Sequence, residues 1–304
     1  MTATSTPVFD LREVSFEYGH GVVALRAVSF SVQRGERLAL LGANGSGKST
    51  LLKIMAGLAA PTGGAISAFG APLAADLLRD TAAAHEFRRR VGIVFQSADA
   101  QLFTPTVRDE IAFGPLHLEL PRDQVLARVE DTLRMLGLDD LAERAPYNLS
   151  GGEKKKVALA AVLSINPEVL MFDEPAAGLD PRTQQWLLEL LARLHGAGKT
   201  IIIATHRLDE LGRIADRALI LAEDHTVAAV GPVAELLADR GLLLAANLIH
   251  EHAHYHGEVL HSHPHGHVDD EALEHGEPLP HEHDHGAPVP EGNGAPVPDD
   301  HSGL

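Results

Sequence analysis

The sequence predicts an α/β fold, in which a mostly parallel sheet is covered by helices on both of its faces. Five short apolar runs are expected to form the strands, and they occupy residues 37–42, 91–95, 168–174, 200–206 and 217–223. They are apolar throughout rather than alternating, which indicates strands that are buried on both faces. Helical patterns such as those of residues 49–58 and 181–195 separate the runs, and this alternation is typical of α/β proteins.

Two segments depart from this alternation. The stretch from about 99 to 159 is mainly helical and is punctuated by four prolines, so we expect a helical subdomain inserted into the α/β core. From residue 248 to 304 the chain is rich in histidine, proline, glycine and acidic residues. Such a composition buries too little apolar area to offset its chain entropy, so we expect a disordered tail. The predicted organisation is therefore a domain over 1–247 followed by a tail over 248–304.

Composition narrows the class of protein. The net charge is −17, but 12 of the 42 acidic residues and no basic residue lie in 250–304, which leaves 30 acidic against 25 basic residues before it. This nearly balanced body gives no indication of nucleic-acid binding. The absence of cysteine excludes disulfides and thiolate metal sites. No apolar stretch approaches the roughly 18 residues of a membrane span, and no export signal is recognisable at the start, so we expect no export.

The segment "GANGSGKST" carries the first functional motif. It fits the pattern G-x-x-x-x-G-K-[ST], directly after an apolar run and before a helical one. In this context glycine lets backbone N–H groups surround phosphate oxygens, and the helix N-terminus adds its positive dipole. We expect Lys48 to meet the β- and γ-phosphates and Ser49 to bind Mg²⁺. The candidate ATP-binding residues are Gly42, Ala43, Asn44, Gly45, Ser46, Gly47, Lys48, Ser49 and Thr50.

Two acidic residues end the apolar run "VLMFDE". In open α/β sheets the carboxyl ends of the strands border the crevice where ligands bind. We therefore interpret Asp173 as a partner of Mg²⁺ through water and Glu174 as the general base that activates the attacking water.

The segment "LSGGEKKKVALA" at 149–160 closely resembles the signature motif of ABC ATPases, the nucleotide-binding subunits of ABC transporters. Other motifs of that family follow in order along residues 8–240. Tyr18 matches the aromatic residue that stacks on adenine, Gln96 the Q-loop glutamine, Asp180 the D-loop aspartate and His206 the switch histidine. The resemblance implies a P-loop NTPase core of the RecA-like kind with a helical subdomain.

The resemblance also implies how the site works. Glu174, His206, Lys48 and Gln96 are the expected catalytic residues, and Ser49, Gln96 and Asp173 are expected to hold Mg²⁺. In this family each ATP is shared, so Ser150, Gly151, Gly152 and Glu153 of one subunit should cap the ATP held by the other. We therefore expect a homodimer, with a heterodimer with a paralogue as the alternative.

A narrower resemblance concerns residues 91–120, which look like the Q-loop region of energy-coupling-factor ATPases through Asp99, Gln101, Leu102 and Phe103. Glu153 stands where the signature usually has glutamine, as in the cobalt and nickel branch. Arg207 departs from the aspartate that often follows the switch histidine there. The resemblance implies an ATPase at the cytoplasmic face of the cell membrane that energises the uptake of a transition metal ion, cobalt or nickel. Its partners are an integral-membrane transmembrane component and a substrate-binding membrane component.

The tail holds thirteen of the nineteen histidines. Pairs of the form His-x-His chelate divalent transition metals through imidazole, so the tail is interpreted as a binder of Ni²⁺, Co²⁺ or a similar ion. The alternative is a solvated tail whose metal affinity is incidental. The candidate ligands are His250, His252, His254, His256, His261, His263, His265, His267, His281, His283 and His285.

Other functions stay open at this stage. Within the class, the chain fits an energy-coupling-factor ATPase for a vitamin or a zinc-importer ATPase. From other classes, it fits a soluble ABC ATPase that remodels a protein complex, or a metal-storage protein with a vestigial ATPase. The intact Lys48, Glu174 and His206 argue against the last of these. Lys154, Lys155 and Lys156 are interpreted as a charged helix face, and His225 is given no role.

Overall fold

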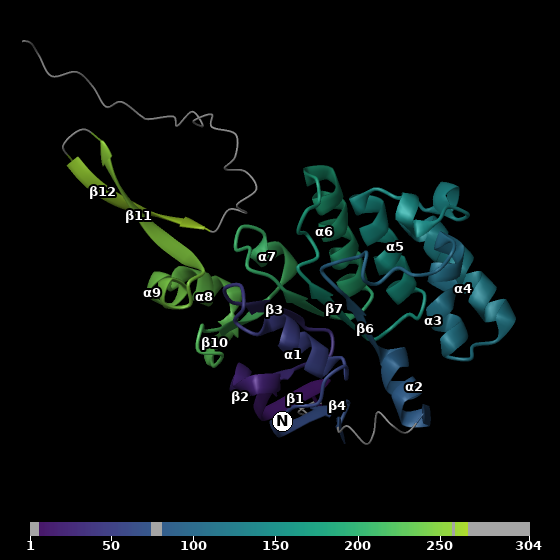
Figure 1. The fold of residues 1–304 in the computed structure, drawn as a ribbon, viewed down its shortest axis with the longest axis horizontal. Helices are drawn as coiled ribbons and strands as arrows, with labels where there is room; N and C mark the ends of the chain where they lie inside the picture. Colours follow the sequence, from purple (N-terminus) through teal and green to yellow (C-terminus); the bar gives the residue numbers. More distant parts are fainter. Residues whose placement is uncertain (1–5, 74–80, 257–258, 267–304) are drawn as a thin grey trace, which may run out of the picture. The chain divides into compact units, whose positions relative to one another are not determined.

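A six-stranded sheet forms the centre of the computed structural model, which describes residues 6–73, 81–256 and 259–266. Its strand order is β10-β9-β3-β8-β7-β6, with β10 antiparallel to its neighbour and the others parallel (Figure 1). The strands are β3 (Arg37–Leu41), β6 (Val91–Val94), β7 (Val169–Asp173), β8 (Thr200–Ala204), β9 (Arg217–Leu221) and β10 (Val227–Pro232). All five apolar runs of the sequence therefore form neighbouring strands of one sheet.

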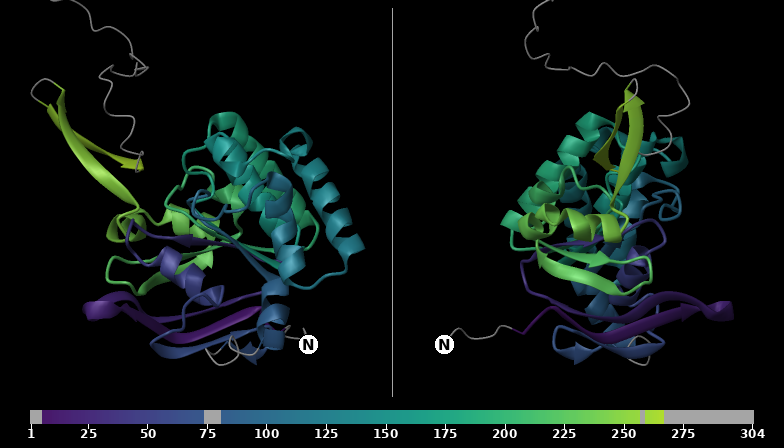
Figure 2. Two further views of the ribbon diagram at one scale, coloured as in Figure 1. Left: turned by 45° about the vertical axis from the view of Figure 1, so that its right-hand side comes forward. Right: turned by 90° about the vertical axis from the view of Figure 1, so that its left-hand side faces the viewer.

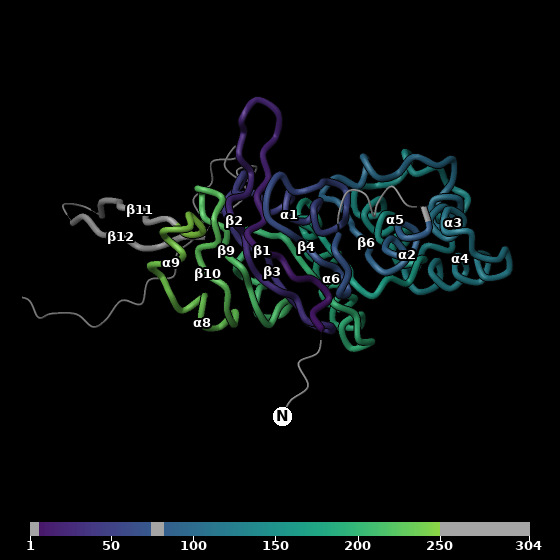
Figure 3. The backbone as a smooth tube through the Cα atoms, turned by 90° about the horizontal axis from the view of Figure 1, so that it is seen from below, coloured from purple at the N-terminus to yellow at the C-terminus, as the bar shows by residue number. Residues whose placement is uncertain are grey.

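A second, antiparallel sheet has the order β2-β1-β4-β5. It comprises β1 (Phe9–Tyr18), β2 (Val22–Val32), β4 (Gly63–Ala68) and β5 (Ala71–Pro72), and Figure 3 shows β1 and β2 running side by side. The sequence analysis did not predict this sheet. Register shifts interrupt the pairing of β1 with β2, and Glu13 and Ala27 have positive φ angles of 50° and 46°. These bulges break the two-residue period by which strands are recognised.

Helix α1 (Lys48–Met55) lies between the two sheets, as both views of Figure 2 show. Its side chains Leu51, Leu52 and Met55 are fully buried and share one core with Phe9 of β1 and Leu38 of β3. Because apolar strands cover the helix from two sides, its N-terminus is held firmly at the carboxyl edge of the central sheet. That edge is where the phosphate motif begins.

The opposite face of the central sheet is covered by helices of the inserted segment and by α6 (Pro181–Gly196). The insertion between β6 and β7 contains α3 (Val107–His117), α4 (Arg122–Leu136) and α5 (Gly151–Leu163), with two 3₁₀ turns, η2 (Asp139–Leu141) and η3 (Pro146–Asn148). Helix α5 thus continues past residue 159, where the sequence analysis ended the helical stretch. Helix α2 (Thr81–Arg90) leads into β6, and η1 (Gly19–Gly21) forms the tip between β1 and β2.

Three short helices, α7 (Leu211–Ile214), α8 (Val233–Ala238) and α9 (Arg240–Ala245), pack on Leu41 and Ile220 in a third core. Leu248 is 1% exposed and belongs to this core, which Ile249 also contacts. None of the helices in the described ranges is both long and apolar enough to cross a bilayer.

The backbone beyond this core differs from the expectation of a structureless tail. It forms two antiparallel strands, β11 (Ile249–His256) and β12 (Val259–Gly266). Histidine recurs there at every second position, which is also the period of a strand. The expected disorder of residues 267–304 lies outside the described residues, as do the side chains of the candidate histidine ligands.

Candidate nucleotide-binding site

Three neighbouring strands place the candidate residues at one edge of the sheet. The parallel registers align Leu40 of β3 and Asp173 of β7 with Ala204 of β8. The segments that leave these strands therefore start side by side. They carry the phosphate loop from Gly42, then Glu174, and then His206, so residues far apart in sequence converge at the crevice.

The phosphate loop is enclosed by backbone from distant parts of the chain. Gly47 has a φ angle of 109°, and a Cβ atom there would lie 2.2 Å from the carbonyl oxygen of Ala24. A Cβ atom on Gly42 would lie 2.8 Å from the carbonyl oxygen of Leu221. Only glycine fits these two positions, because a side chain would collide with backbone that cannot move aside.

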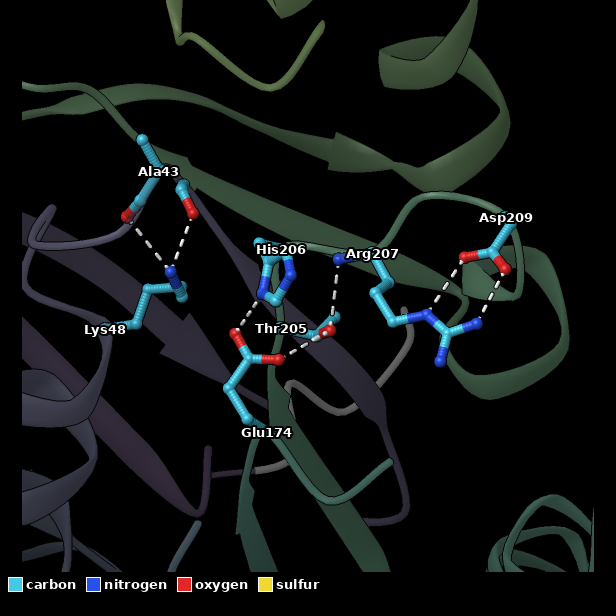
Figure 4. A network of polar contacts seen from close by, with 8 residues as sticks. Ala43, Lys48, Glu174, Thr205, His206, Arg207 and Asp209 are labelled. Atoms are coloured by element: carbon cyan, nitrogen blue, oxygen red, sulfur yellow. Dashed lines mark hydrogen bonds and ion pairs between the residues drawn. The ribbon is translucent and has the colours of Figure 1, made fainter. Parts of the chain in front are cut away.

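Lys48 is buried in the first turn of α1. Its Nζ atom donates to the carbonyl oxygens of Gly42 at 2.7 Å and Ala43 at 3.1 Å (Figure 4). Burial lowers the pKa of the Lys48 ammonium, and the nearby charges of Glu174 and Asp173 oppose that shift. The cation is thus held inside the loop, beside two acids.

Asp173 ends β7 and is 6% exposed. Burial raises its pKa, and a hydrogen bond with the Ser49 side chain acts in the opposite direction. Within the described chain, Asp173 Oδ1 and the buried Ser46 Oγ have no hydrogen-bond partner. Buried polar atoms normally have one, so these two atoms mark a place for a polar ligand. The hydroxyl and carboxylate oxygens gathered here are the kind of ligand that Mg²⁺ prefers.

Glu174 follows directly, with a φ angle of 44°. Its Oε1 atom lies 2.8 Å from Nδ1 of His206, and its Oε2 atom accepts from Thr205 Oγ1 at 3.1 Å. Figure 4 shows these three side chains facing one another at the ends of β7 and β8. The carboxylate is fixed in one orientation at the edge of the phosphate loop, as a general base requires. The sequence analysis did not identify Thr205.

Tyr18 contacts the first helix, α1. Its hydroxyl lies 2.9 Å from Thr50 Oγ1, and its ring packs edge-on against Phe16 with a centroid distance of 4.9 Å. Tyr18 is the last residue of β1. The ring is 44% exposed, so an oriented aromatic surface stands beside α1.

Gln96 and Asp180 lie on segments that follow β6 and β7. Gln96 is exposed and follows β6, whose Val94 is in register with Phe172 of β7. It therefore leaves the sheet at the same edge as Asp173. Asp180 is the N-cap of α6, and its Oδ1 atom accepts from the backbone N–H groups of Arg182 and Thr183 at 3.0 and 3.1 Å. Helix capping accounts for these contacts.

The signature segment starts α5 with a capping box. Ser150 accepts from the backbone N–H of Glu153, and Glu153 Oε2 accepts from the Ser150 backbone N–H at 2.8 Å and from its hydroxyl at 2.7 Å. Hydrogen bonds from Ser150 lower the pKa of Glu153. Ser150 and Gly151 are exposed at the helix N-terminus, and Gly152 is half-buried. An anion meets N–H groups and a positive dipole at such a terminus.

Two further residues contact these motifs although the sequence gave no reason to single them out. Lys155 does not lie on a solvated face, since its ammonium binds backbone carbonyls of the loop after β7. His225 Nδ1 lies 3.4 Å from the carbonyl oxygen of Ser46 in the phosphate loop. Both contacts join segments that are far apart in sequence, so no local sequence pattern predicts them.

Comparison with known proteins decides the family. The model of the ABC transporter family matches residues 25–177, which span the phosphate loop, the signature segment and β7. The chain belongs to the ABC transporter family. It is an ATP-binding subunit of the energy-coupling-factor type and an ATPase, as the resemblance of its motifs implied.

Individual relatives of this ABC ATPase are similar over most of their length. It is 51% identical to a nickel import ATP-binding protein of Rhodobacter capsulatus over 80% of this chain and 96% of the relative. It is 40% identical to an energy-coupling factor transporter ATP-binding protein of Methanothermobacter thermautotrophicus, over 79% of this chain and 76% of the relative.

A solved structure has the same fold. It is cbiO1 of Clostridium perfringens, described as part of the ABC transporter complex cbiONQ, with 34% identity and a TM-score of 0.67. The match covers 80% of this chain and 95% of that one.

Proposed function

We propose that this ABC ATPase energises the uptake of a transition metal ion, nickel or cobalt, through membrane partners. The observation that carries the proposal is the meeting of Lys48, Asp173 and Glu174 at one edge of the sheet. The choice of a metal as cargo is supported by the 51% identity of this chain to a nickel import ATP-binding protein.

The chemistry follows from the positions of the side chains. Lys48 offsets the negative charge that develops on the β- and γ-phosphates of ATP. Glu174 takes the proton of the attacking water, while Thr205 and His206 hold its carboxylate by the contacts described above. We infer that His206 also contacts the γ-phosphate, since its ring lies beside Glu174 at the same edge of the sheet. Mg²⁺ held by Ser49, Asp173 and Gln96 would offset phosphate charge and align the oxygens. Tyr18 supplies a flat face for adenine.

The working unit is a dimer. Each chain contributes one phosphate loop and one signature segment. Ser150 and Gly151 are exposed at the N-terminus of α5, and the half-buried Gly152 follows them, so an anion can approach this helix end. We infer that these three residues bind the phosphates of the ATP held by a second copy. One ATP then contacts both subunits, so its hydrolysis controls their association. A paralogue could replace the second copy without changing this geometry.

The surface for the membrane component is a groove of about 280 Å³. Residues of α2, β6, α3 and α5 line it, and Phe103 and Phe113 border it with exposed fractions of 66% and 46%. The two rings meet edge-on at a centroid distance of 4.8 Å, and His117 stacks on Phe113 at 5.9 Å. Aromatic residues exposed around a groove are typical of a surface that binds a helix of another protein.

A buried carboxylate shapes this groove. Glu110 is 3% exposed, and its Oε2 atom accepts from the backbone N–H groups of Phe103 and Thr104 at 3.0 and 2.9 Å and from Thr104 Oγ1 at 2.8 Å. Phe103 is therefore held in place although it is exposed, which favours a preformed docking surface.

The histidine-rich tail supports the choice of a metal as cargo. The backbone register of β11 and β12 sets His250 opposite His265, His252 opposite His263, and His254 opposite His261. Alternate positions of a strand belong to one face, so these six positions share a face of the ribbon. We infer that the tail collects divalent metal near the transporter. The acidic residues of the tail favour cations around it.

Uptake by cells tests the proposal. Cells without this chain, cells with it and cells with the Glu174→Gln variant are given radiolabelled nickel or cobalt, and the chain is recovered from their membranes with its partners. We expect uptake only with the unaltered chain, and recovery of a membrane complex with both forms. Unchanged metal uptake without the chain would refute the proposal, and uptake of a vitamin instead would favour the energy-coupling-factor alternative.

A further inference from the structure

Lys155 connects two motifs that serve different active sites. It lies on α5, in the second turn after the signature residues. Its Nζ atom donates to the carbonyl oxygen of Pro175 at 3.2 Å and to that of Ala177. Both carbonyls belong to the loop from Glu174 to Asp180, which begins with the general base. One ammonium thus joins the signature helix to the loop that carries the base.

The ammonium is not an ordinary surface charge. Its side chain lines a small cavity together with Phe172 and Leu159, and burial lowers its pKa, while the charge of Glu174 opposes that shift. Removing a charge from water is costly unless the charge is hydrogen-bonded. The neighbouring Lys154 differs, because it pairs with Asp99, whose side chain is 75% exposed.

The loop from Glu174 to Asp180 has few backbone hydrogen bonds of its own, so contacts from other segments, such as those of Lys155, help to hold its shape. Its own backbone bonds run from Ala177 N–H to the Glu174 carbonyl and from Leu179 N–H to the Ala176 carbonyl. Along the loop, the carbonyls of Glu174 and Ala176 accept these backbone bonds, and the carbonyls of Pro175 and Ala177 alternate with them in the sequence. Lys155 supplies their hydrogen bonds, and so fixes the half of the loop that is next to the base.

We propose that Lys155 is a positioning residue that couples the signature helix to the loop of the general base. The inference rests on the proposed dimer, in which the signature serves the ATP of the partner while Glu174 serves the ATP of its own chain. Closure of the signature on one ATP then sets the position of the base at the other. A single side chain therefore affects both the association of two subunits and the hydrolytic step.

The Lys155→Met variant of the full-length chain tests this coupling. Methionine keeps most of the length of the side chain but removes its charge and its donors. Lys199→Met is the matched control, since Lys199 also donates to a backbone carbonyl, that of Asn166, and burial lowers its pKa as well. Three quantities are measured: nucleotide affinity of the monomer, ATP-driven dimerisation in a Glu174→Gln background, and kcat at saturating protein and ATP.

We expect Lys155→Met to leave the nucleotide affinity of the monomer unchanged. We expect it to weaken ATP-driven dimerisation about tenfold and to lower kcat about tenfold, each equivalent to about 1.4 kcal/mol. Lys199→Met should change none of the three. A side chain that only supports α5 would affect dimerisation alone, and one that only supports the loop would affect kcat alone. Either single effect, or no effect, overturns the proposal.

Two provisions keep the test decisive. If Lys155→Met does not fold, Lys155→Gln enters the same measurements, since its shorter side chain does not reach both carbonyls. If the Glu174→Gln parent forms no dimer with ATP, the proposed dimer itself fails. A parent that dimerises, with Lys155 variants that behave like it, rejects the coupling and leaves the dimer standing.

Discussion

Glu174 shows how much of the site is decided by single residues. Its carboxylate holds two hydrogen bonds, and its backbone has a φ angle of 44°, which is uncommon for a residue with a side chain. Such a conformation persists only where the surroundings enforce it, and it is concentrated at functional sites. Here the backbone N–H of Glu174 donates to the carbonyl oxygen of Ala204 at 2.9 Å, which joins Glu174 to the end of the strand that precedes His206.

The Glu174→Gln variant should bind ATP and form a stable dimer with it, but hydrolyse it at least about 10²-fold more slowly, because an amide cannot accept the proton of the water. Steady-state hydrolysis and size-exclusion chromatography with ATP measure the two effects. Glu189→Gln, on the surface of α6, is the control and should behave like the unaltered chain. Turnover close to normal in Glu174→Gln would exclude the assigned role.

Gly47 should tolerate no side chain. In Gly47→Ala the new Cβ atom would approach the Ala24 carbonyl oxygen to 2.2 Å at a φ angle of 109°. We expect a loss of about 2 kcal/mol or more in the free energy of unfolding, together with loss of ATP binding. Gly196→Ala is the control, since nothing lies within 4 Å of its Cβ position at the end of α6, and it should stabilise the chain slightly. Equal unfolding curves for Gly47→Ala and Gly196→Ala would contradict the conclusion that the surrounding backbone leaves no room for a side chain at position 47.

For single residues, the sequence predicted a place in the site only where the neighbouring residues form a recognisable strand or loop motif. Lys48, Asp173 and Glu174 adjoin apolar strands, so their place at the sheet edge could be foreseen. Thr205 and Lys155 could not be foreseen as contacts, because their partners Glu174 and Ala177 lie on other segments. The sequence of Lys154, Lys155 and Lys156 predicted a solvated helix face, because the contacts of Lys155 with another segment depend on the fold.

Among elements, the central strands could be predicted and the N-terminal sheet could not. Strands buried on both faces leave continuous apolar runs, whereas β1 and β2 are interrupted by bulges and are covered on one side by α1. The helical insertion was visible from its prolines and its helical pattern. The groove beside it was not visible, because α2, β6, α3 and α5 form it together.

The groove can be tested through one of its exposed rings. Phe103→Asp should leave ATP binding and basal hydrolysis intact, because Phe103 lines the groove and contacts Phe113 and Glu110, which lie outside the phosphate loop. It should reduce recovery of the membrane complex at least about tenfold. Leu126→Asp is the control, as Leu126 is also exposed, at 54%, but lies on α4 outside the groove. Recovery of the complex is measured by affinity purification from solubilised membranes. An equal recovery for both variants would place the docking surface elsewhere.

At the scale of the whole molecule, the folded body and the tail should be separable. The third core includes Leu248 and contacts Ile249, so a chain ending at Ile249 keeps its packing, whereas one ending at Asn247 loses a buried leucine. The sequence alone drew the boundary by composition and could not see this packing. The composition does separate the segment with thirteen histidines from every ATPase motif, and the division of the chain at this point stays a prediction.

The chain ending at Ile249 should retain its ATPase rate and its ATP-driven dimerisation, and should lose most of its binding of Ni²⁺ or Co²⁺. Metal must bind neutral imidazole, whose reference pKa is about 6.5, so protonation should release it between about pH 7 and about pH 5. Calorimetric titration of both chains at several pH values measures this. Equal metal stoichiometry in the two chains would reject a role of the tail in metal capture.

The enclosure of the phosphate loop has a consequence for biosynthesis. The loop occurs early in the chain, yet the carbonyl of Leu221 closes it from one side and that of Ala24 from the other, and His225 contacts Ser46. A nascent chain therefore cannot complete the loop before β9 has been made and has joined the sheet. We expect ATP to bind only chains that have been made at least as far as His225, and to stabilise them by mass action. Nucleotide occupancy would then distinguish chains in which β9 has joined the sheet from shorter nascent chains, which lack the enclosing carbonyl of Leu221.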